Sequence, residues 1–168
     1  LAIAPNARIA VLGDGKLGLL AALVLATRGL DPVLAGKHSR KLALARARGL
    51  QTAAPDQLEP KSFDFVIEAT GSPSGMQRAV ELVRPRGTIV LKSTYHGALS
   101  LDAAPIVIDE ISVVGSRCGP FPPALDELAA QQIDPRPLVD FEYPLAGAER
   151  ALEHAGQPGV LKVLLKIS

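Results

Sequence analysis

Short apolar runs rich in β-branched residues alternate with longer Ala- and Leu-rich or amphipathic segments along most of the chain. Continuous apolar runs of this kind are typical of strands that are covered on both faces of a parallel sheet. They predict strands at residues 8–12, 33–35, 51–53, 63–69, 88–92 and 111–115. The intervening segments predict helices at residues 16–28, 40–48 and 74–83. Because strand–helix alternation builds right-handed βαβ crossovers, the pattern predicts an α/β fold with a doubly wound sheet.

The pattern changes after residue 92, where prolines divide the chain more often. An apolar run at 105–109 predicts one more strand before 111–115, without a full helix between them. Pro120, Pro122 and Pro123 break the chain ahead of a predicted helix at 124–132. The remainder predicts a strand at 138–143, a helix at 146–155 and a strand at 160–167. We therefore expect a main domain at 1–137 and a strand–helix–strand segment at 138–168.

A turn with three glycines joins the first predicted strand to the first predicted helix. Gly13, Gly15 and Gly18 have the G-x-G-x-x-G spacing of a dinucleotide site. The first glycine permits a sharp turn, the second lets a pyrophosphate approach the backbone, and the third lets the helix pack closely on the strand. The free N–H groups of the helix beginning near Lys16 would hold the phosphates. Asp14 is expected to point outward and to be neutral to function.

The end of the second predicted strand indicates which dinucleotide would bind. An NAD site usually places an acid there to bind the ribose 2′-hydroxyl, but the segment 36–41 contains none. A small residue followed by cations suits a 2′-phosphate, and Lys37 and Arg40 are the best placed cations, with Ser39 as a neutral donor and helix N-cap. The segment therefore favours NADP over NAD, and solvated charges at a helix start are the alternative. Cations at a helix N-terminus also call for a compensating anion.

The net charge, the cysteine count and the histidine positions limit the partners that the chain could bind and the compartment in which it could fold. The chain has 168 residues and a formal net charge of +1, which argues against nucleic-acid or membrane partners bound through bulk charge. Its one cysteine, Cys118, cannot form an internal disulfide, and this fits the cytoplasm. His38, His96 and His154 are scattered, so the chain offers no zinc site. Because the chain begins with Leu1 and not Met, we expect it to be a fragment or an excised domain.

Several stretches taken together resemble the medium-chain, zinc-type alcohol dehydrogenases. The resemblance is carried by residues 13–20, 63–71 and 84–90, and then by 114–117, 143–145, 148–152 and 162–164. These stretches occur in the expected order and spacing over nearly the whole chain. The resemblance implies a Rossmann cofactor domain with a six-stranded parallel sheet, whose last strand, 111–115, commonly pairs across a dimer. It also implies that residues 138–168 normally pack on a separate catalytic domain.

The resemblance also implies a cofactor site, position by position. It assigns the pyrophosphate turn to Gly13, Gly15, Lys16, Leu17 and Gly18. It assigns the adenosine ribose loop to Gly36, Lys37, His38, Ser39 and Arg40. It assigns the strand end that borders the adenosine half to Ala69, Thr70 and Gly71. It assigns the loops that approach the nicotinamide to Lys92, Ser93, Gly115, Ser116 and Arg117. A doubly wound sheet places all these segments at the carboxyl ends of its strands, where ligands bind.

The resemblance implies an activity that this chain carries only in part. The family's catalytic domain, with its zinc ligands, has no counterpart here, so zinc is expected only in that missing domain. The parent protein is expected to transfer a hydride between NADP or NAD and a small alcohol or aldehyde. The chain alone is expected to bind the cofactor and to hold no catalytic or metal-binding residue. A regulatory nucleotide-sensing domain without catalysis is the alternative.

Three side chains outside the glycine turn have both a functional and a structural interpretation. Glu68 ends the fourth predicted strand, and we expect it to bond neighbouring backbone amides and not to act in catalysis. Arg117 is either a phosphate or carboxamide contact or an interface ion pair. Cys118 beside it is expected to be a small buried apolar residue, with a reactive thiol as the alternative.

Overall fold

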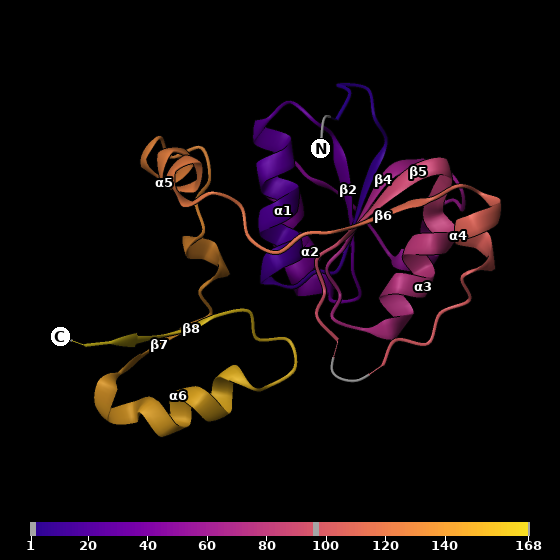
Figure 1. The fold of residues 1–168 in the computed structure, drawn as a ribbon. Helices are drawn as coiled ribbons and strands as arrows, with labels where there is room; N and C mark the ends of the chain where they lie inside the picture. Colours follow the sequence, from indigo (N-terminus) through magenta and orange to yellow (C-terminus); the bar gives the residue numbers. More distant parts are fainter. Residues whose placement is uncertain (1–2, 96–97, 168) are drawn as a thin grey trace.

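A parallel sheet of six strands forms the centre of the molecule. The computed structural model describes residues 3–95 and 98–167, and the ribbon is shown in Figure 1. The strands are β1 (Ile9–Leu12), β2 (Pro32–Ala35), β3 (Gln51–Ala53), β4 (Phe63–Glu68), β5 (Val83–Leu91) and β6 (Ser112–Gly115). All neighbouring pairs are parallel and the strand order is β3-β2-β1-β4-β5-β6. The predicted doubly wound, six-stranded Rossmann sheet is therefore confirmed.

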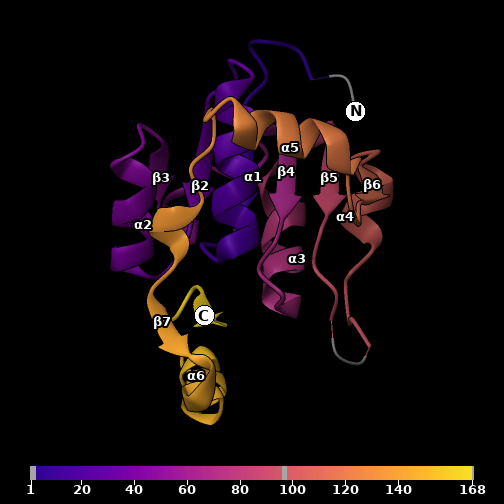
Figure 2. The same cartoon turned by 90° about the vertical axis from the view of Figure 1, so that its left-hand side faces the viewer.

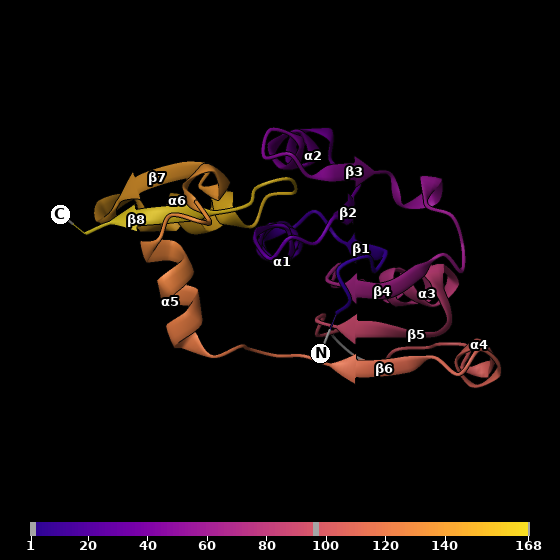
Figure 3. The same ribbon diagram turned by 90° about the horizontal axis from the view of Figure 1, so that it is seen from above.

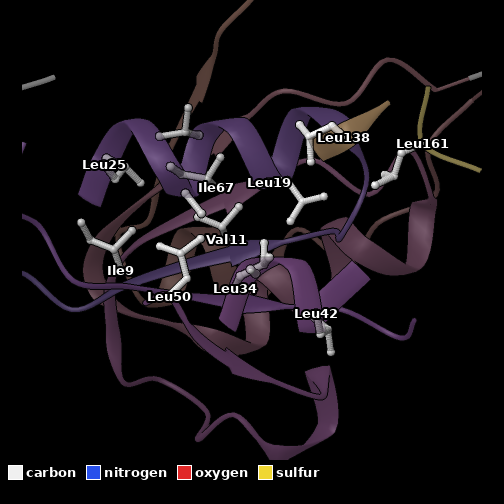
Figure 4. Close-up of a cluster of buried hydrophobic side chains, with 13 residues drawn as sticks. Ile9, Val11, Leu19, Leu25, Leu34, Leu42, Leu50, Ile67, Leu138 and Leu161 are labelled. Carbon is white, nitrogen blue, oxygen red and sulfur yellow. The ribbon is translucent and has the colours of Figure 1, made fainter. Parts of the chain in front are cut away.

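Helices cover both faces of this sheet. They are α1 (Lys16–Thr27), α2 (Ser39–Arg46), α3 (Pro73–Leu82) and α4 (Ala104–Ile108). Figure 3 shows α1 and α2 on one face and α3 and α4 on the other. Successive side chains of β1 alternate between the faces: Ile9 and Val11 pack in a cluster with Leu19 of α1, whereas Ala10 and Leu12 pack in the cluster under α3. Figure 4 shows the first cluster. Each fully buried aliphatic side chain stabilises the fold by about 1.5–3 kcal/mol. The two clusters between the sheet and its helices are therefore the main source of stability.

The segment before β6 is a helix, and the predicted strand at 105–109 is wrong. β5 and β6 are parallel neighbours, and parallel strands need a crossover connection that lies over the sheet. α4 makes that crossover, with Pro105 in its first turn and the Asp102 carboxylate accepting the Ala104 N–H at 3.0 Å. Ile106 packs against the cluster under α3, whereas Val107 and Ile108 are 76% and 77% exposed. The β-branched composition of the run favours a strand locally, and the crossover between β5 and β6 overrides this preference.

Two helix starts also differ from the prediction. The helix expected at 124–132 is α5 (Phe121–Ala129), because Pro122 and Pro123 occupy its first turn, where a missing N–H costs no hydrogen bond. Ser39 is the first residue of α2 and does not cap it; the N-cap is His38, without a side-chain cap bond. Within residues 3–95 and 98–167, no helix is both long and apolar enough to cross a membrane.

The last part of the chain, residues 138–167, forms what we call the C-terminal unit. β7 (Phe141–Pro144) and β8 (Val163–Lys166) form a separate two-stranded parallel sheet, joined by α6 (Ala148–Ala155). The predicted strand–helix–strand segment is confirmed. Short 3₁₀ turns complete the chain: η1 (Pro55–Gln57), η2 (Arg136–Leu138) and η3 (Leu145–Gly147). Figure 2 views the molecule from the side on which the C-terminal unit and α5 lie.

One buried carboxylate ties the C-terminal unit to α2. The side chain of Asp140 is only 4% exposed and accepts from Arg40 Nη1 at 2.7 Å and from the Leu161 N–H. Arg40 Nη2 also donates to the Gly159 carbonyl at 3.1 Å. Burial by itself raises the pKa of Asp140, but the hydrogen bonds from Arg40 and Leu161 bring that pKa below its ordinary value. Leu138 and Leu161 complete the junction, since both belong to the apolar cluster under α1.

Replacing Asp140 with Ala should loosen the C-terminal unit, because the Arg40 guanidinium and the Leu161 N–H lose their shared acceptor. We expect a cost of about 1–3 kcal/mol to docking of this unit. Hydrogen exchange should accelerate in residues 138–167 and stay unchanged in β1 and β4.

Asp134→Ala is the matched control, because Asp134 pairs with nearby Arg136 at an exposed position. The pKa of Asp140 is lower in the folded state than in the unfolded chain. The Asp140 carboxylate therefore stabilises docking fully above the unfolded-state pKa of about 3.9, and this stabilisation is lost as the pH falls through the folded-state pKa. Equal exchange rates in the wild type and Asp140→Ala would contradict the role of Asp140 in holding the C-terminal unit.

Candidate functional site

A cleft of about 420 Å³ opens at the carboxyl ends of β1, β2 and β4. Its lining consists of Leu12, Gly13, Asp14, Gly15, Ala35, Gly36, Lys37, His38, Lys41, Pro55, Ala69, Thr70, Ser72, Ser74, Gly75 and Arg78. The strand order runs outward in both directions from β1 and β4, and the cleft lies at this switch point. Ligands of open α/β sheets bind at such a point, and the volume is in the range of small-molecule sites.

The glycine turn at the centre of the cleft has the geometry that its sequence predicted. Gly13 has φ +113°, and a Cβ there would lie 2.6 Å from the carbonyl oxygen of Ala69. A Cβ on Gly18 would overlap the carbonyl oxygen of Gly13, so only glycine lets α1 approach the turn this closely. A Cβ on Gly15 would meet nothing within 4 Å, which leaves the backbone open toward the cleft.

The N-terminus of α1 faces the same turn and has unused donors. Its first intrahelical bond runs from the Leu19 N–H to the Gly15 carbonyl at 3.0 Å. The N–H groups of Lys16, Leu17 and Gly18 therefore have no partner within the helix. The first turn also contains no acidic residue. The turn and the positive end of the helix together form a site suited to an anion.

Asp14 does not point outward, and the prediction of its orientation is wrong. It is 6% exposed, and its Oδ2 accepts the N–H groups of Lys37 and His38, both at 2.7 Å. His38 Nδ1 lies 2.9 Å from its Oδ1. Burial raises the pKa of Asp14, but the His38 N–H and ring, with the Lys37 N–H, bring the pKa below its ordinary value. Asp14 thus places an anion at the N-terminus of α2, and Asp140 is the carboxylate that pairs with the Arg40 guanidinium there.

The structure divides the predicted ribose loop into two parts. Lys37 and His38 line the cleft, whereas Arg40 is held by Asp140 of the C-terminal unit and is not among the lining residues. Ser39 borders a different hollow beside β3. Lys41 lines the cleft and is only 7% exposed, although sequence reasoning placed the cationic role on its neighbours. Its position within the first turn of α2, facing back to the sheet, was the signal that could have identified it.

Glu68 forms a buried network at the end of β4. It is fully buried and its Oε1 accepts the N–H of Thr70 at 2.8 Å, which confirms the predicted backbone bond. The same oxygen accepts the Thr70 hydroxyl at 2.5 Å, and Oε2 accepts the Tyr95 hydroxyl at 2.6 Å. Burial, followed by the Glu68 carboxylate, raises the pKa of Tyr95 far above its ordinary value. Tyr95 was not predicted, and it anchors the loop after β5 to β4.

The segments assigned to the nicotinamide side come together at the ends of β5 and β6. Lys92 Nζ donates to the Arg117 carbonyl at 2.7 Å and to Ser116 Oγ at 3.3 Å. The Gly71 N–H donates to Ser93 Oγ at 2.8 Å, so the ends of β4 and β5 are joined as well. Both interpretations of the Arg117 side chain stay predictions.

Two further expectations concern cysteine and histidine. Cys118 is exposed, so the prediction that it is buried is wrong; it follows β6, after the chain has left the sheet. His96 lies outside the described residues. Within the described ranges, no three His, Cys, Asp or Glu side chains are grouped as a metal site would require.

The chain belongs to the zinc-binding dehydrogenase family, whose model matches residues 17–131. D-arabinitol dehydrogenase 1 of Uromyces fabae is 28% identical over 96% of this chain and 52% of its own length. L-idonate 5-dehydrogenase (NAD(P)(+)) of Escherichia coli K12 is 29% identical over 89% of this chain and 47% of its own length. The chain thus spans about half the length of these curated relatives.

Solved structures show the same fold. The crystal structure of L-idonate 5-dehydrogenase from Escherichia coli K-12 has a TM-score of 0.86 and 28% identity, covering 95% of this chain and 50% of that one. A zinc-binding dehydrogenase from Sinorhizobium meliloti 1021, solved with bound NADP, has a TM-score of 0.83 and 24% identity, covering 95% and 52%. At that lower identity the likeness is evidence for the fold alone.

Replacing Tyr95 with Phe should destabilise the fold by about 1–3 kcal/mol, because a buried carboxylate oxygen of Glu68 loses its donor. Urea unfolding at neutral pH measures the change. Tyr143→Phe is the control, since it removes a hydroxyl that pairs with His154 in the C-terminal unit. Equal unfolding midpoints for Tyr95→Phe and the wild type would show that the Tyr95 hydroxyl contributes nothing to the network.

Proposed function

We propose that this chain is the cofactor-binding part of an NAD(P)-dependent dehydrogenase that oxidises an alcohol or polyol, or reduces the matching carbonyl compound. The observation that carries the proposal is the cleft at the switch point, with the open turn at Gly15 and the free N–H groups of α1. Family membership adds support, as do relatives named for oxidation of D-arabinitol and L-idonate. The family match also favours this function over a nucleotide-sensing domain.

Each part of the site has a task in this proposal. The backbone of Gly13–Gly18 receives the pyrophosphate, because the N–H groups of Lys16, Leu17 and Gly18 have no partner within α1 and a Cβ on Gly15 would meet nothing within 4 Å. The adenosine half lies between the loop at 36–41 and the strand end at 69–71. The nicotinamide half lies toward Lys92, Ser93 and the segment 115–117, which hydrogen bonds hold together. A bound nicotinamide supplies the hydride chemistry, and these residues orient it.

We further propose that the preferred cofactor is NADP. No acid ends β2, and the side chains of Lys37 and Lys41 both border the cleft. A 2′-phosphate gains charge-assisted hydrogen bonds from two such ammonium groups, and a 2′-hydroxyl gains much less. Arg40 contributes less to binding of the 2′-phosphate than its sequence position suggests, because Asp140 and the Gly159 carbonyl already hold its guanidinium.

The substrate and the catalytic zinc belong, in this proposal, to a further domain of a longer protein. Phe141, Leu145, Leu152 and Ile167 of the C-terminal unit are 43%, 55%, 72% and 84% exposed. Exposed apolar side chains of this kind are suited to packing against such a domain. The single cysteine supports a reducing compartment such as the cytoplasm.

Calorimetric titration with NADPH and NADH tests the cofactor proposal. We expect NADPH to bind more tightly than NADH, and Lys37→Ala to weaken NADPH about tenfold while changing NADH by less than about twofold. Lys162→Ala, which removes an exposed cation outside the cleft, should change neither affinity. NADH binding as tightly as NADPH would reject NADP preference, and binding of neither would reject the site.

We also infer that β6 pairs with its counterpart in a homodimer. It is the edge strand of the main sheet, and its Val113 and Val114 are 41% and 36% exposed. An uncovered edge of this kind offers free N–H and C=O groups to a second copy. The Ser116 N–H donates to the Leu91 carbonyl of β5, so by alternation the N–H of Val114 faces β5 and that of Val113 faces outward.

Replacing Val113 with Pro should therefore keep the fold and abolish the dimer, because only an outward N–H is removed. Sedimentation velocity measures the mass, and circular dichroism checks the fold. Val114→Pro is the matched comparison: it removes an N–H that faces β5 and should lower the unfolding midpoint. A wild type that sediments as a monomer, or a Val113→Pro variant that remains dimeric, would contradict the pairing of β6.

A further inference from the structure

The carboxylate of Asp14 occupies the space that a side chain at the end of β2 would need. A Cβ added to Gly36 would overlap Cβ and Oδ2 of Asp14 and would lie 2.6 Å from its Cγ. Gly36 is itself buried. The missing acid at position 36 therefore does not leave an open hole for a phosphate. The negative charge is present in this region after all, and it comes from the glycine turn.

Asp14 also occupies hydrogen-bond donors of the ribose loop. Its Oδ2 takes the N–H groups of Lys37 and His38, and its two oxygens lie 2.9 and 3.0 Å from His38 Nδ1. Two successive backbone N–H groups with a flanking imidazole form a concave anion site of the kind that binds phosphate oxygens. Here this anion site is filled by the protein's own carboxylate, which also lines the cleft.

The other charged groups on this wall are cations or are already paired. Lys37 and Lys41 line the cleft, and His38 faces Asp14. Arg78 lines the opposite side, where its guanidinium donates to the carbonyls of Pro55 and Leu58 and pairs with Glu81. Asp14 is the only acidic residue among the residues of the described chain that line this cleft. Among these lining residues, Asp14 is therefore the source of electrostatic repulsion toward an incoming phosphate.

We propose that Asp14 is a specificity-determining residue, which weakens binding of a 2′-phosphorylated dinucleotide relative to one with a free 2′-hydroxyl. It does so by charge repulsion across the cleft wall and by holding the two loop N–H groups that a phosphate would otherwise accept. The inference rests on the proposed dinucleotide function of the cleft. Lys37 and Lys41 attract the 2′-phosphate and Asp14 opposes it, so the preference of the wild type is a balance of the two.

Asp14→Asn tests this proposal, because the amide oxygen keeps the size and the acceptor but loses the charge. The measured quantity is the ratio of the NADPH and NADH affinities of the whole chain, from fluorescence titration at fixed ionic strength. We expect the ratio to shift toward NADPH by at least about tenfold. Asp126→Asn, which removes the same charge from an exposed position on α5 outside the cleft, should leave the ratio unchanged.

The ratio separates a charge effect from a structural one. A loosened loop would weaken both cofactors by the same factor, and this outcome, or an unchanged ratio, would overturn the role of Asp14. Asp14→Ser gives a second reading if the Asn variant does not fold, since its hydroxyl can still accept one loop N–H and the same shift is expected. A wild type that binds neither cofactor would overturn the proposed function, and this inference with it.

Discussion

The close approach of α1 to the turn before it is the constraint on which the site depends. A single added methyl group at Gly18 would overlap the Gly13 carbonyl, and one at Gly13 would reach the Ala69 carbonyl of the next strand. Because these backbone contacts join β1, α1 and β4, they fix the helix N-terminus, the open Gly15 and the edge of β4 in one rigid arrangement. The position of the predicted ribose loop then follows, since Asp14 within this turn accepts the N–H groups of Lys37 and His38 after β2.

Local signals explain what the sequence could predict. The six strands were found because parallel strands covered on both faces leave continuous apolar runs, and the glycine turn because its spacing reflects steric needs within a few residues. The segment 105–109 was mistaken for a strand because its β-branched residues favour strands locally, whereas the parallel crossover from β5 to β6 makes it a short helix. Asp14, Arg40 and Tyr95 could not be placed, since each is bound to a partner at least 24 residues away. Such contacts leave no periodic pattern.

The ribose loop shows why the end of β2 is an incomplete guide to cofactor choice. Positions 14 and 36 compete for one volume, so an acid at position 36 requires a smaller residue at position 14. A carboxylate is therefore present beside the end of β2 although position 36 is a glycine. Discrimination between the cofactors depends on where the charges lie in space, and two segments of the chain have to be considered together.

Arg40 connects the predicted ribose loop to the C-terminal unit through hydrogen bonds. It lies in the first turn of α2, next to Lys41 in the cleft wall, and its guanidinium binds Asp140 and the Gly159 carbonyl of the C-terminal unit. A ligand that shifts the start of α2 therefore also biases the position of that unit. By thermodynamic reciprocity, whatever docks on the unit changes the affinity of the loop by the same factor. The contacts of Arg40 thus join the wall of the cleft to the C-terminal unit.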